Sequence, residues 1–480
     1  MGDASLSARA LDTLLGDWRG ASDDTVYGAL AERVRLLVID GRIPVDTRLP
    51  AERDLAERLG LSRATVTAAY GRLREQGHLH SVRGSGSVAR LPGAPAILPA
   101  PLAGPHPDLS KAAPPALPWL GDAARAAVDD LPRHLADSGY DPIGLPELRA
   151  AIAARYTVRG LPTDPDQVMV TIGAQHAIAL LSRALLHRGD RAVIETPTYP
   201  HAYEALRSAG ARLVGVPVSP ADAGPVVAAD DVDSLVRAFG HANPAVAYLM
   251  PDFQNPTGRS LPAAARERVL DAAARQGTVV IADETTAELD IDRAESLLPM
   301  AAYGDAVLVG SVGKTIWGGL RVGWIRADRP LLRKLLAVRP PNDLGTPILD
   351  QLIVANVFDR MDDVIAFRGA QLRTGRDHLE ALLADAFPEW HVPHVAGGIA
   401  TWVGLGAPIS SQLALAARAQ GLIVAAGPRF GIDGAFERFL RLPICLPTDV
   451  LDASVAALAR AWRSLSGVPV TDPGLLADVV

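Results

Sequence analysis

Apolar positions recur along the chain with two spacings, one typical of amphipathic helices and one of short buried strands. In the first 90 residues, the helical spacing predicts a helix over Val26–Gly41, a short helix that ends at Leu59, and a third helix that begins after Ser62. The Ser62 hydroxyl suits an N-cap, because it can accept a hydrogen bond from the first helical turn. Further on, His78–Val82 and Ser87–Arg90 flank the glycine-rich sequence RGSG, which predicts a hairpin. Three helices and a hairpin predict a winged helix-turn-helix module.

The N-terminal region also differs in charge from the rest of the chain. Residues 25–90 hold 11 Arg, no Lys and 7 acidic residues, a balance of +4, whereas the remainder has a balance of −11. The net charge of −7 alone would argue against a nucleic-acid ligand, but a basic module attached to an acidic body is typical of a DNA-binding protein. Small residues on one face of the third helix would allow close approach to a groove. They are Ala64, Thr67, Ala68 and Gly71.

A proline-rich segment divides the chain. Residues 91–118 contain nine prolines in 28 positions, which favours a semi-rigid spacer over a helix or strand. We therefore predict a DNA-binding domain over 1–90, a linker over 91–118 and a larger domain over 119–480. No apolar run reaches the ~18 residues of a membrane span, and the N-terminus does not resemble a secretory signal. The single cysteine, Cys445, allows no intrachain disulfide, and no Cys/His spacing predicts a metal. We expect a cytoplasmic, nucleoid-associated protein.

Beyond the linker, five apolar runs have the length of buried strands, and amphipathic patterns such as Gln175–Leu186 and Ala263–Gln276 follow several of them. This alternation predicts an α/β fold with a mostly parallel sheet and helices on both faces. In such sheets ligands bind beyond the carboxyl ends of the strands, so the residues after each run are the first candidates for a site. The runs are Gln167–Thr171, Arg191–Ile194, Ala245–Met250, Val279–Ala282 and Ala306–Val309.

The first three runs are followed by residues that suit a planar, phosphorylated ligand. Ala174 and Gln175 open a helix after a glycine turn, where free backbone N–H groups can bind a phosphate. Tyr199, between two prolines, can stack on a ring, and a packing role is an equal alternative. Asn255 precedes a proline, which favours an extended backbone with the amide free to point into a cleft; a plain turn is the alternative.

The last two runs end on groups that complete this chemistry. Asp283 ends a buried strand, where a carboxylate needs a partner such as a protonated heterocyclic nitrogen, an arginine or backbone N–H groups. Lys314, one of only three lysines, lies in a glycine-rich, apolar context between Ser311 and Arg321. The amine suits a Schiff base with an aldehyde, and the hydroxyl and guanidinium suit a phosphate. One ligand combines all these features, pyridoxal 5′-phosphate.

From about Leu117 to Leu465 the chain resembles the fold-type I aminotransferase family, through these residues in this order. The resemblance implies that Lys314 forms the internal aldimine and that Asp283 pairs with the pyridine nitrogen. It also implies that Asn255 bonds the phenolic oxygen and that Tyr199 stacks on the ring. The phosphate is assigned by the same resemblance to Ala174, Gln175, Ser311 and Arg321.

The resemblance implies two further contacts and shows one gap. Arg441 matches the arginine that binds an amino acid α-carboxylate, and Tyr140, in GYDPIGLPELR, matches a loop that reaches the neighbouring subunit's site. Relatives carry a tyrosine two or three residues after the equivalent of Asp283, which also bonds the phenolic oxygen. Here Thr285 and Thr286 stand at those positions. A threonine hydroxyl is too short to replace that tyrosine, which should perturb the proton affinity of the aldimine and weaken turnover.

The N-terminal region resembles the GntR-type winged helix-turn-helix domain from Tyr27 to Val88, through LPAERDLAERLGLSRATV, AAYGRLREQG and GSGSV. The alternative is a helical packing module with ordinary surface arginines. The resemblance implies contacts to DNA from the third helix and the wing. The implied residues are Arg53, Ser62, Arg63, Thr65, Arg83 and Gly84.

The two halves together resemble the MocR/GabR-type transcription regulators. This resemblance implies a homodimer, domain-swapped so that each DNA-binding module packs across the partner's body, and promoter DNA as a partner. We hypothesise that pyridoxal 5′-phosphate itself, or an amino compound that displaces Lys314 and pairs with Arg441, changes promoter binding. The main alternative is a working aminotransferase with an accessory N-terminal domain, against which Thr285 and Thr286 count mildly. A regulator that has lost the cofactor is a third alternative, against which the intact lysine counts.

Overall fold

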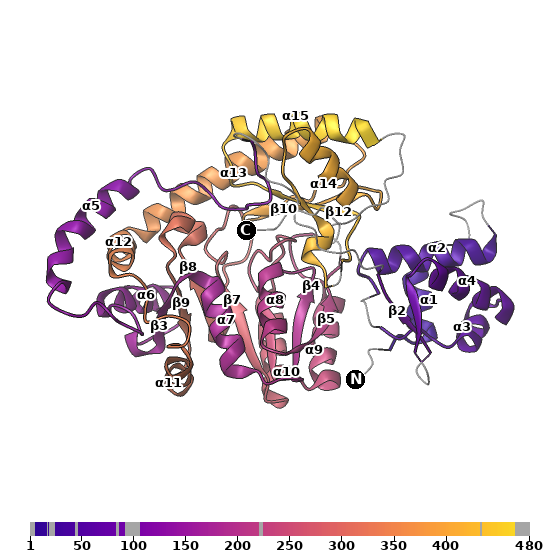
Figure 1. Cartoon of the computed structure of the whole chain (residues 1–480), viewed down its shortest axis with the longest axis horizontal. Coiled ribbons are helices and arrows are strands. Elements are labelled where there is room, and N and C mark those ends of the chain that lie inside the picture. Colours follow the sequence, from indigo (N-terminus) through magenta and orange to yellow (C-terminus); the bar gives the residue numbers. More distant parts are fainter. Residues whose placement is uncertain are drawn as a thin grey trace.

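The computed structural model divides into a small N-terminal module and a larger body, which Figure 1 shows side by side. None of the helices that it describes combines the length and apolar character needed to cross a membrane. The structure describes residues 5–16, 18, 25–43, 47–82, 86–91, 106–219, 224–432 and 434–465.

The three predicted helices and the hairpin of the N-terminal module are confirmed, and one further helix, which was not predicted, precedes them over Ala8–Leu15. The helices pack around a core that includes Leu30 and Val34 of α2 and Val66 and Leu73 of α4. The Ser62 hydroxyl accepts from Thr65 N–H at 3.1 Å, which confirms the N-cap. The two strands form the antiparallel hairpin. The elements are α1 (Ala8–Leu15), α2 (Val26–Ile39), α3 (Glu52–Leu59), α4 (Arg63–Glu75), β1 (Leu79–Val82) and β2 (Gly86–Ala89).

The body contains a seven-stranded sheet in the order β3-β9-β8-β7-β6-β4-β5. Strand β9 runs antiparallel to both of its neighbours, and the other pairs are parallel, so the predicted mostly parallel sheet is confirmed. All five predicted runs form strands of this sheet. The strands are β3 (Val168–Thr171), β4 (Arg191–Thr196), β5 (Arg212–Pro217), β6 (Val246–Leu249), β7 (Val279–Asp283), β8 (Val307–Ser311) and β9 (Gly323–Arg326).

Helices bury both faces of this sheet. Alternate strand residues enter two separate apolar clusters: Ala247 and Val280 belong to one, and Val246 and Ile281 belong to the other. Helices α5, α6, α9, α10 and α12 contribute to the first cluster, and α7, α8 and α11 to the second. Their bounds are α5 (Leu120–Asp130), α6 (Pro146–Val158), α7 (Gly173–Leu185), α8 (Pro200–Ser208), α9 (Ala229–Ala242), α10 (Ala263–Arg275), α11 (Arg329–Val338) and α12 (Ile348–Phe358).

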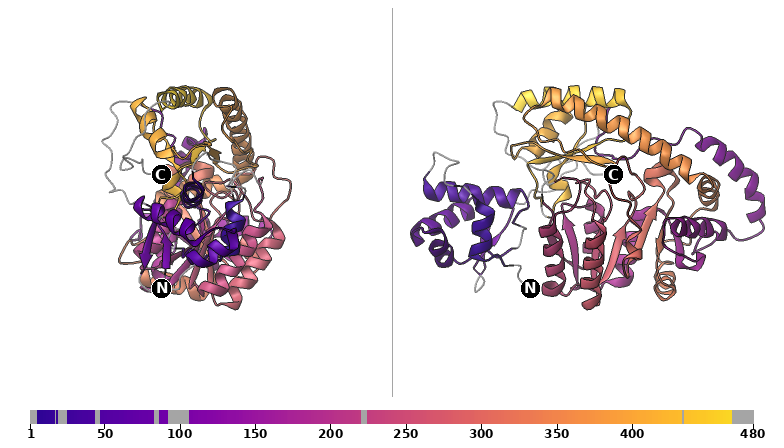
Figure 2. Two further views of the ribbon diagram at one scale, coloured as in Figure 1. Left: turned by 90° about the vertical axis from the view of Figure 1, so that its right-hand side faces the viewer. Right: turned by 180° about the vertical axis from the view of Figure 1, so that it is seen from behind.

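The C-terminal part of the body adds a smaller antiparallel sheet in the order β10-β12-β11. Figure 2 shows, from behind, that α13 and α15 lie over this part of the molecule, away from the large sheet. Side chains alternate along β12. Leu440 and Leu442 therefore enter the apolar cluster on one face of the small sheet, whereas Arg441, between them, lies on the other face and is buried there. The elements are β10 (Ala400–Gly404), β11 (Ala425–Ala426), β12 (Phe439–Pro443), α13 (Met361–Ala386), α14 (Ser410–Ala419) and α15 (Thr448–Leu465).

Residues 106–118, the described half of the predicted linker, lie against the body, and we call them the strap. Leu109 N–H donates to Ile423 O at 2.8 Å, and Arg368 Nη2 donates to Pro115 O at 2.6 Å. Leu109 and Ala112 are buried. The strap is therefore fixed at both ends, and its middle part crosses the body.

Candidate functional site

A cavity of about 550 Å³ opens at the carboxyl ends of the parallel strands, where the strand pattern places a ligand. The structure brings every predicted cofactor-contacting residue, and Arg441, to the lining of this one cavity. Tyr140 lies outside the lining and is 70 % exposed. The predicted residues that line the cavity are Ala174, Gln175, Tyr199, Asn255, Asp283, Ser311, Lys314, Arg321 and Arg441.

Lys314 lies on a single π-helical turn, Gly313–Trp317, directly after β8. Its Nζ donates to the strap at Ala112 O, at 2.8 Å. Burial, and to a smaller extent the positive charge of Arg441, lowers the pKa of Lys314 to about 8, while the nearby Cys445 and Asp283 oppose the shift. A large fraction of the amine is therefore neutral near pH 8, as a nucleophilic lysine requires.

Asp283 is buried at the end of β7 and has two hydrogen-bond donors. Tyr248 on the neighbouring strand β6 donates its hydroxyl to Oδ2 at 2.6 Å, and Thr285 N–H donates to Oδ1 at 3.0 Å. Burial raises the pKa of Asp283, and these two donors oppose that shift. Tyr248 is not among the residues that the sequence predicted for the site. It and Asp283 share one face of the sheet, and a hydroxyl in a buried strand always needs a partner, so the alternation could have revealed it.

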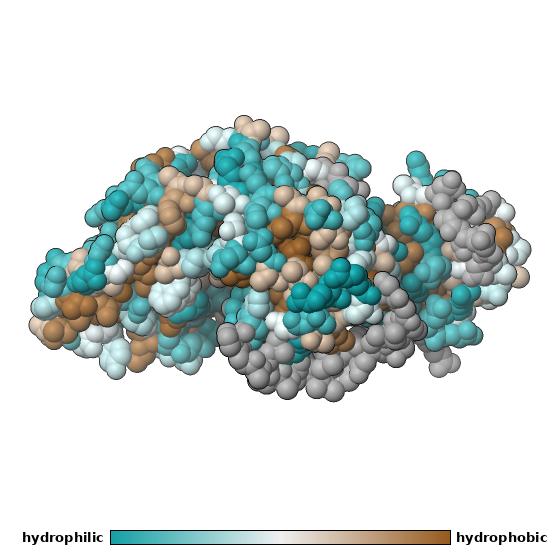
Figure 3. Space-filling model, turned by 90° about the horizontal axis from the view of Figure 1, so that it is seen from above, coloured by the Kyte–Doolittle hydropathy of each residue, from teal (hydrophilic) through white to brown (hydrophobic). Residues whose placement is uncertain are grey.

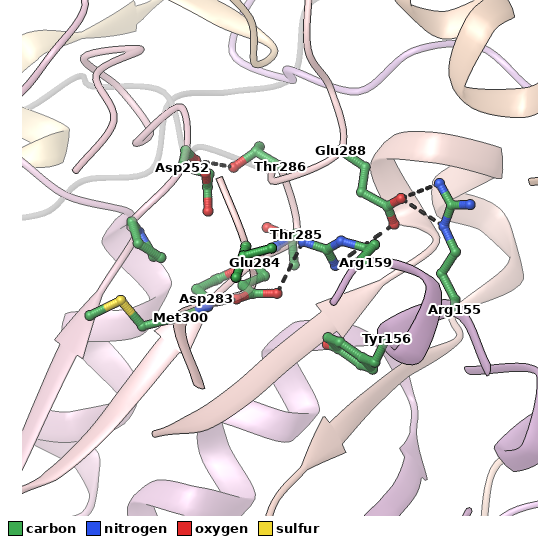
Figure 4. A network of polar contacts seen from close by, with 12 residues as sticks. Arg155, Tyr156, Arg159, Asp252, Asp283, Glu284, Thr285, Thr286, Glu288 and Met300 are labelled. Atoms are coloured by element: carbon green, nitrogen blue, oxygen red, sulfur yellow. Dashed lines mark hydrogen bonds and ion pairs between the residues drawn. The ribbon is translucent and has the colours of Figure 1, made fainter. Parts of the chain in front are cut away.

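The Thr286 hydroxyl does not replace the tyrosine that the resemblance implies. Figure 4 shows the Thr286 hydroxyl directed to the backbone of Asp252, and its Oγ1 donates to Asp252 O at 2.8 Å. Thr285 lies between the cofactor cavity and a smaller pocket that Arg159 and Glu284 also line. Arg159 Nη2 is 3.4 Å from Glu284 Oε2 there. The hydroxyl of Thr286 is thus committed elsewhere.

The start of α7 provides a seat for a phosphate. Gly173 has φ +77°, a backbone conformation that favours glycine, and a Cβ at this position would lie 2.6 Å from Arg321 Nη2 and would displace the end of that side chain. The first N–H groups of α7, at Ala174 and Gln175, point out of the helix end. Arg321 itself has φ +52°, a left-handed conformation that is uncommon for a side-chain-bearing residue and is found at functional sites.

The residues present fit pyridoxal 5′-phosphate. Two buried atoms at the cavity, Asn255 Oδ1 and Gln175 Oε1, have no hydrogen-bond partner among the described residues. Buried polar atoms rarely stay unpaired, so these are places where a ligand can donate or accept. Gln175 Nε2 meanwhile donates to His201 O at 3.0 Å, which fixes the orientation of the amide. Cavity volume, phosphate seat, amine and carboxylate together match this cofactor.

Arg441 is a buried cation that has no counter-ion among the described residues. Its Nη2 donates to the strap carbonyls of Leu109, at 3.4 Å, and Ser110, and its Cζ lies 5.3 Å from the centre of the Phe430 ring. No carboxylate of the described residues forms an ion pair with it, and burial lowers its pKa to about 10. An unpaired buried guanidinium is costly, so the site favours a ligand that carries a carboxylate.

Further residues that line the cavity were missed because they come from places that no strand-end rule covers. Ala113 belongs to the strap, His201 to the first turn of α8, and Ile399 to the segment before β10. Met250 follows β6 inside one of the predicted runs and gave no chemical signal.

On the module, the predicted DNA-contacting residues of α3 and α4 share an exposed region. Arg53, Ser62 and Arg63 are exposed, and Thr65 is half-buried. Neither Arg53 nor Arg63 forms an ion pair with a carboxylate of the described residues, so both guanidinium groups are available to phosphates. The opposite stripe of α4 is buried in the module core. The predicted wing contacts, Arg83 and Gly84, lie outside the described residues.

Known protein families match both the body and the N-terminal module. Residues 121–458 match the family of class I and II aminotransferases, and residues 26–88 match the gntR family of bacterial regulatory proteins. The chain is 30 % identical to a 2-aminoadipate transaminase of Thermus thermophilus over 339 residues, which cover 68 % of this chain and 82 % of the relative.

Two further proteins extend the comparison. The HTH-type transcriptional regulator YisV of Bacillus subtilis is 25 % identical, over 94 % of this chain and 99 % of its own. The crystal structure of LysN, an alpha-aminoadipate aminotransferase from Thermus thermophilus, is similar with a TM-score of 0.67 and 27 % identity, over 75 % of this chain and 93 % of that one. The chain belongs to the class I and II aminotransferase family and, with its gntR-type domain, is a pyridoxal-phosphate-dependent transcription regulator of the MocR/GabR type.

Proposed function

We propose that this regulator senses pyridoxal 5′-phosphate or an amino compound at Lys314 and in response changes its binding to promoter DNA. One observation carries the proposal: Lys314 and Arg441 line the same cavity, and among the described residues each is hydrogen-bonded only to backbone carbonyls of the strap. Both cations are therefore available to a ligand with complementary groups.

The cofactor site follows from the groups around the cavity. When bound, pyridoxal 5′-phosphate supplies an aldehyde that a primary amine can attack. Lys314 provides that amine, and Asp283, held by Tyr248, offers a carboxylate to the pyridine nitrogen. Asn255 orients the phenolic oxygen and Tyr199 covers the ring. The start of α7, with Ser311 and Arg321, binds the phosphate.

Arg441 determines which chemical class of effector the cavity can bind. A buried guanidinium that lacks a carboxylate selects a ligand with one, and an amine on the same ligand would compete with Lys314. We therefore propose an amino acid or a related amino carboxylate as the second candidate effector, beside pyridoxal 5′-phosphate itself.

We also propose a homodimer, domain-swapped through the linker. Figure 3 shows hydrophobic surface at the end of the molecule that carries α5. Large exposed apolar patches mark protein interfaces. The proposed arrangement is a DNA-binding domain over 1–90, a linker over 91–118 and a body over 119–480, in a cytoplasmic, nucleoid-associated protein. Exposed apolar side chains on α5, α12 and the adjacent loops are Val128, Leu135, Tyr140, Leu344 and Leu349.

The test compares regulator and enzyme directly. The full chain, loaded with pyridoxal 5′-phosphate, is used to select fragments from a random DNA library and is assayed for steady-state keto-acid formation from a panel of amino acids. A regulator retains one sequence with affinity at least about 10³-fold above bulk DNA and shows little turnover. Sustained turnover at about 1 s⁻¹ or more, with no sequence retained, would instead support the working aminotransferase.

A further inference from the structure

The C-terminal end of α2 rests on the loop that precedes β12 in the body. Phe436 N–H donates to Ile39 O, and Arg438 Nε lies 3.0 Å from Asp40 Oδ1. At the next position, a Cβ on Gly41 would lie 2.5 Å from Cζ of Phe436. The contact thus combines a backbone hydrogen bond, an ion pair and a close approach that only glycine permits. Figure 1 shows the module beside the body at this end of α2.

The loop that receives α2 is held in one conformation. Phe436 has φ +78°, in the left-handed region, which a residue with a side chain adopts only where its surroundings impose it. A Cβ on Gly431 would lie 2.8 Å from the Phe436 ring, and a Cβ on Gly427 would collide with the Phe436 carbonyl. The loop is therefore packed without free space on the body side and meets α2 on the other.

Aromatic rings connect this loop to the cavity. The Phe436 and Trp402 ring centres are 6.0 Å apart, and those of Trp402 and Phe430 are 5.3 Å apart. The guanidinium of Arg441 lies over Phe430, and Trp402 is the residue opposite Arg441 in the pairing of β10 with β12. Phe430 O also accepts from Thr198 N–H, next to Tyr199, at 3.0 Å. We call Phe436, Trp402 and Phe430 the aromatic relay.

We propose that residues 434–438 are the docking surface for the end of α2, and that the state of Arg441 controls this docking through the aromatic relay. A carboxylate that binds Arg441 bidentately competes with the Phe430 face and the strap for the guanidinium. Because the relay is close-packed, a shift of Phe430 must be taken up by its neighbours. The step from effector to Arg441 rests on the proposed function; the docking and the relay do not.

The same two surfaces can meet within one chain or between two. Residues 92–105 join the module to the strap, and in a domain-swapped dimer the end of α2 would meet residues 434–438 of the other copy. Either arrangement links one effector site to the placement of one DNA-binding module, which is what a controlled half-site spacing needs.

The docking is tested with a matched pair of glycine substitutions in the full chain loaded with pyridoxal 5′-phosphate. Gly41 and Gly60 both have left-handed backbones, at φ +69° and +64°, so alanine carries a similar backbone cost at each. A Cβ on Gly60 meets nothing within 4 Å, whereas one on Gly41 meets Phe436. Hydrogen exchange of the peptide that contains Phe436 should be at least tenfold faster in Gly41→Ala and unchanged in Gly60→Ala. No change in either variant, or an equal change in both, overturns the docking.

Two further substitutions test the ion pair and the aromatic relay separately, and neither measurement needs an added effector. Asp40→Asn removes the ion pair to Arg438 without backbone strain, leaves the hydrogen bond of Arg438 to Gly406 O intact, and should speed the same exchange about threefold. Arg441→Gln removes the buried charge at the far end of the relay. It should change exchange of the peptide over residues 36–43 at least threefold, without any added ligand. If that peptide exchanges as in the unsubstituted chain, the relay is wrong, while failure of the proposed function would leave both measurements intact.

Discussion

The cavity of the body and the DNA-facing surface of the module both present arginines to anions, but in opposite surroundings. Arg441 is 1 % exposed, has no counter-ion among the described residues, and is held by carbonyls. Arg53 and Arg63 are exposed to water and salt. A buried charge interacts strongly with a few groups, whereas exposed charges act together and are screened. Single changes in the cavity should therefore be drastic and specific, and changes on the module graded and dependent on salt.

The largest effect should come from Lys314→Ala, because the chain has only two other lysines. We expect complete loss of the visible absorbance of the bound cofactor and of the mass gain after borohydride reduction. Lys334→Ala, at an exposed position on α11, is the matched control and should keep both. A label that persists in Lys314→Ala would show that a different amine holds the cofactor.

Arg441→Gln should rank second and should affect only ligands that carry a carboxylate. Leaving a carboxylate without its buried partner costs about 2 kcal/mol or more, so affinity for L-alanine should fall about 30-fold or more. Ethylamine, which has the amine but no carboxylate, should bind equally to both proteins. Spectral titration of the bound cofactor measures both ligands, and an equal loss for the two would mean that Arg441 acts only on the fold.

Arg63→Ala should weaken DNA binding by about tenfold and should lower the slope of log affinity against log salt by about one. Cofactor absorbance should be unchanged, because the module and the cavity are separate. Arg58, which is already paired with Asp12 at 2.8 Å, provides the control: Arg58→Ala should lose less affinity. Fluorescence anisotropy over a series of salt concentrations gives both quantities. A cofactor that is lost together with DNA binding would contradict the separation.

Tyr248→Phe should have a smaller effect. Removing the hydroxyl takes one of two donors from Asp283, so the pKa of that carboxyl should rise further, by loss of a hydrogen bond to its charged form. The free energy of unfolding should fall by about 1–3 kcal/mol. Denaturant unfolding of the protein without cofactor measures this. Tyr303→Phe, whose hydroxyl accepts from Leu298 N–H at a half-buried position, is the comparison and should cost less.

The smallest effect concerns pH. The pKa of Lys314 is lowered to about 8, chiefly by burial, so the neutral amine is half-formed near pH 8 and nearly complete at pH 9. The rate at which the chain without cofactor reacts with pyridoxal 5′-phosphate should thus rise about twofold between these values. A lysine with its usual pKa of about 10.4 would show a rise of about tenfold. Stopped-flow absorbance distinguishes the two.

The strand-end residues were predictable because each follows an apolar run directly, and the parallel sheet then brings those ends together. Contacts that join distant parts of the chain were not predictable from the sequence. Lys314 and Ala112 are 202 positions apart, and nothing in the proline-rich strap predicts that its carbonyls would meet the lysine. Tyr248 was missed because its run was treated as uniformly apolar. The contact of Gly41 with Phe436 depends on how the module and the body meet, which no local pattern encodes.

The central claim is that the amine of Lys314 connects the ligand in the body to the reader of DNA. The most direct test measures the affinity of a selected DNA fragment with the chain stripped of pyridoxal 5′-phosphate, reloaded with it, and reloaded in the presence of L-amino acids. We expect at least one addition to change the affinity about fivefold or more in the unsubstituted chain, and none to change it in Lys314→Ala. An identical response in the two proteins, or none in either, would contradict the account.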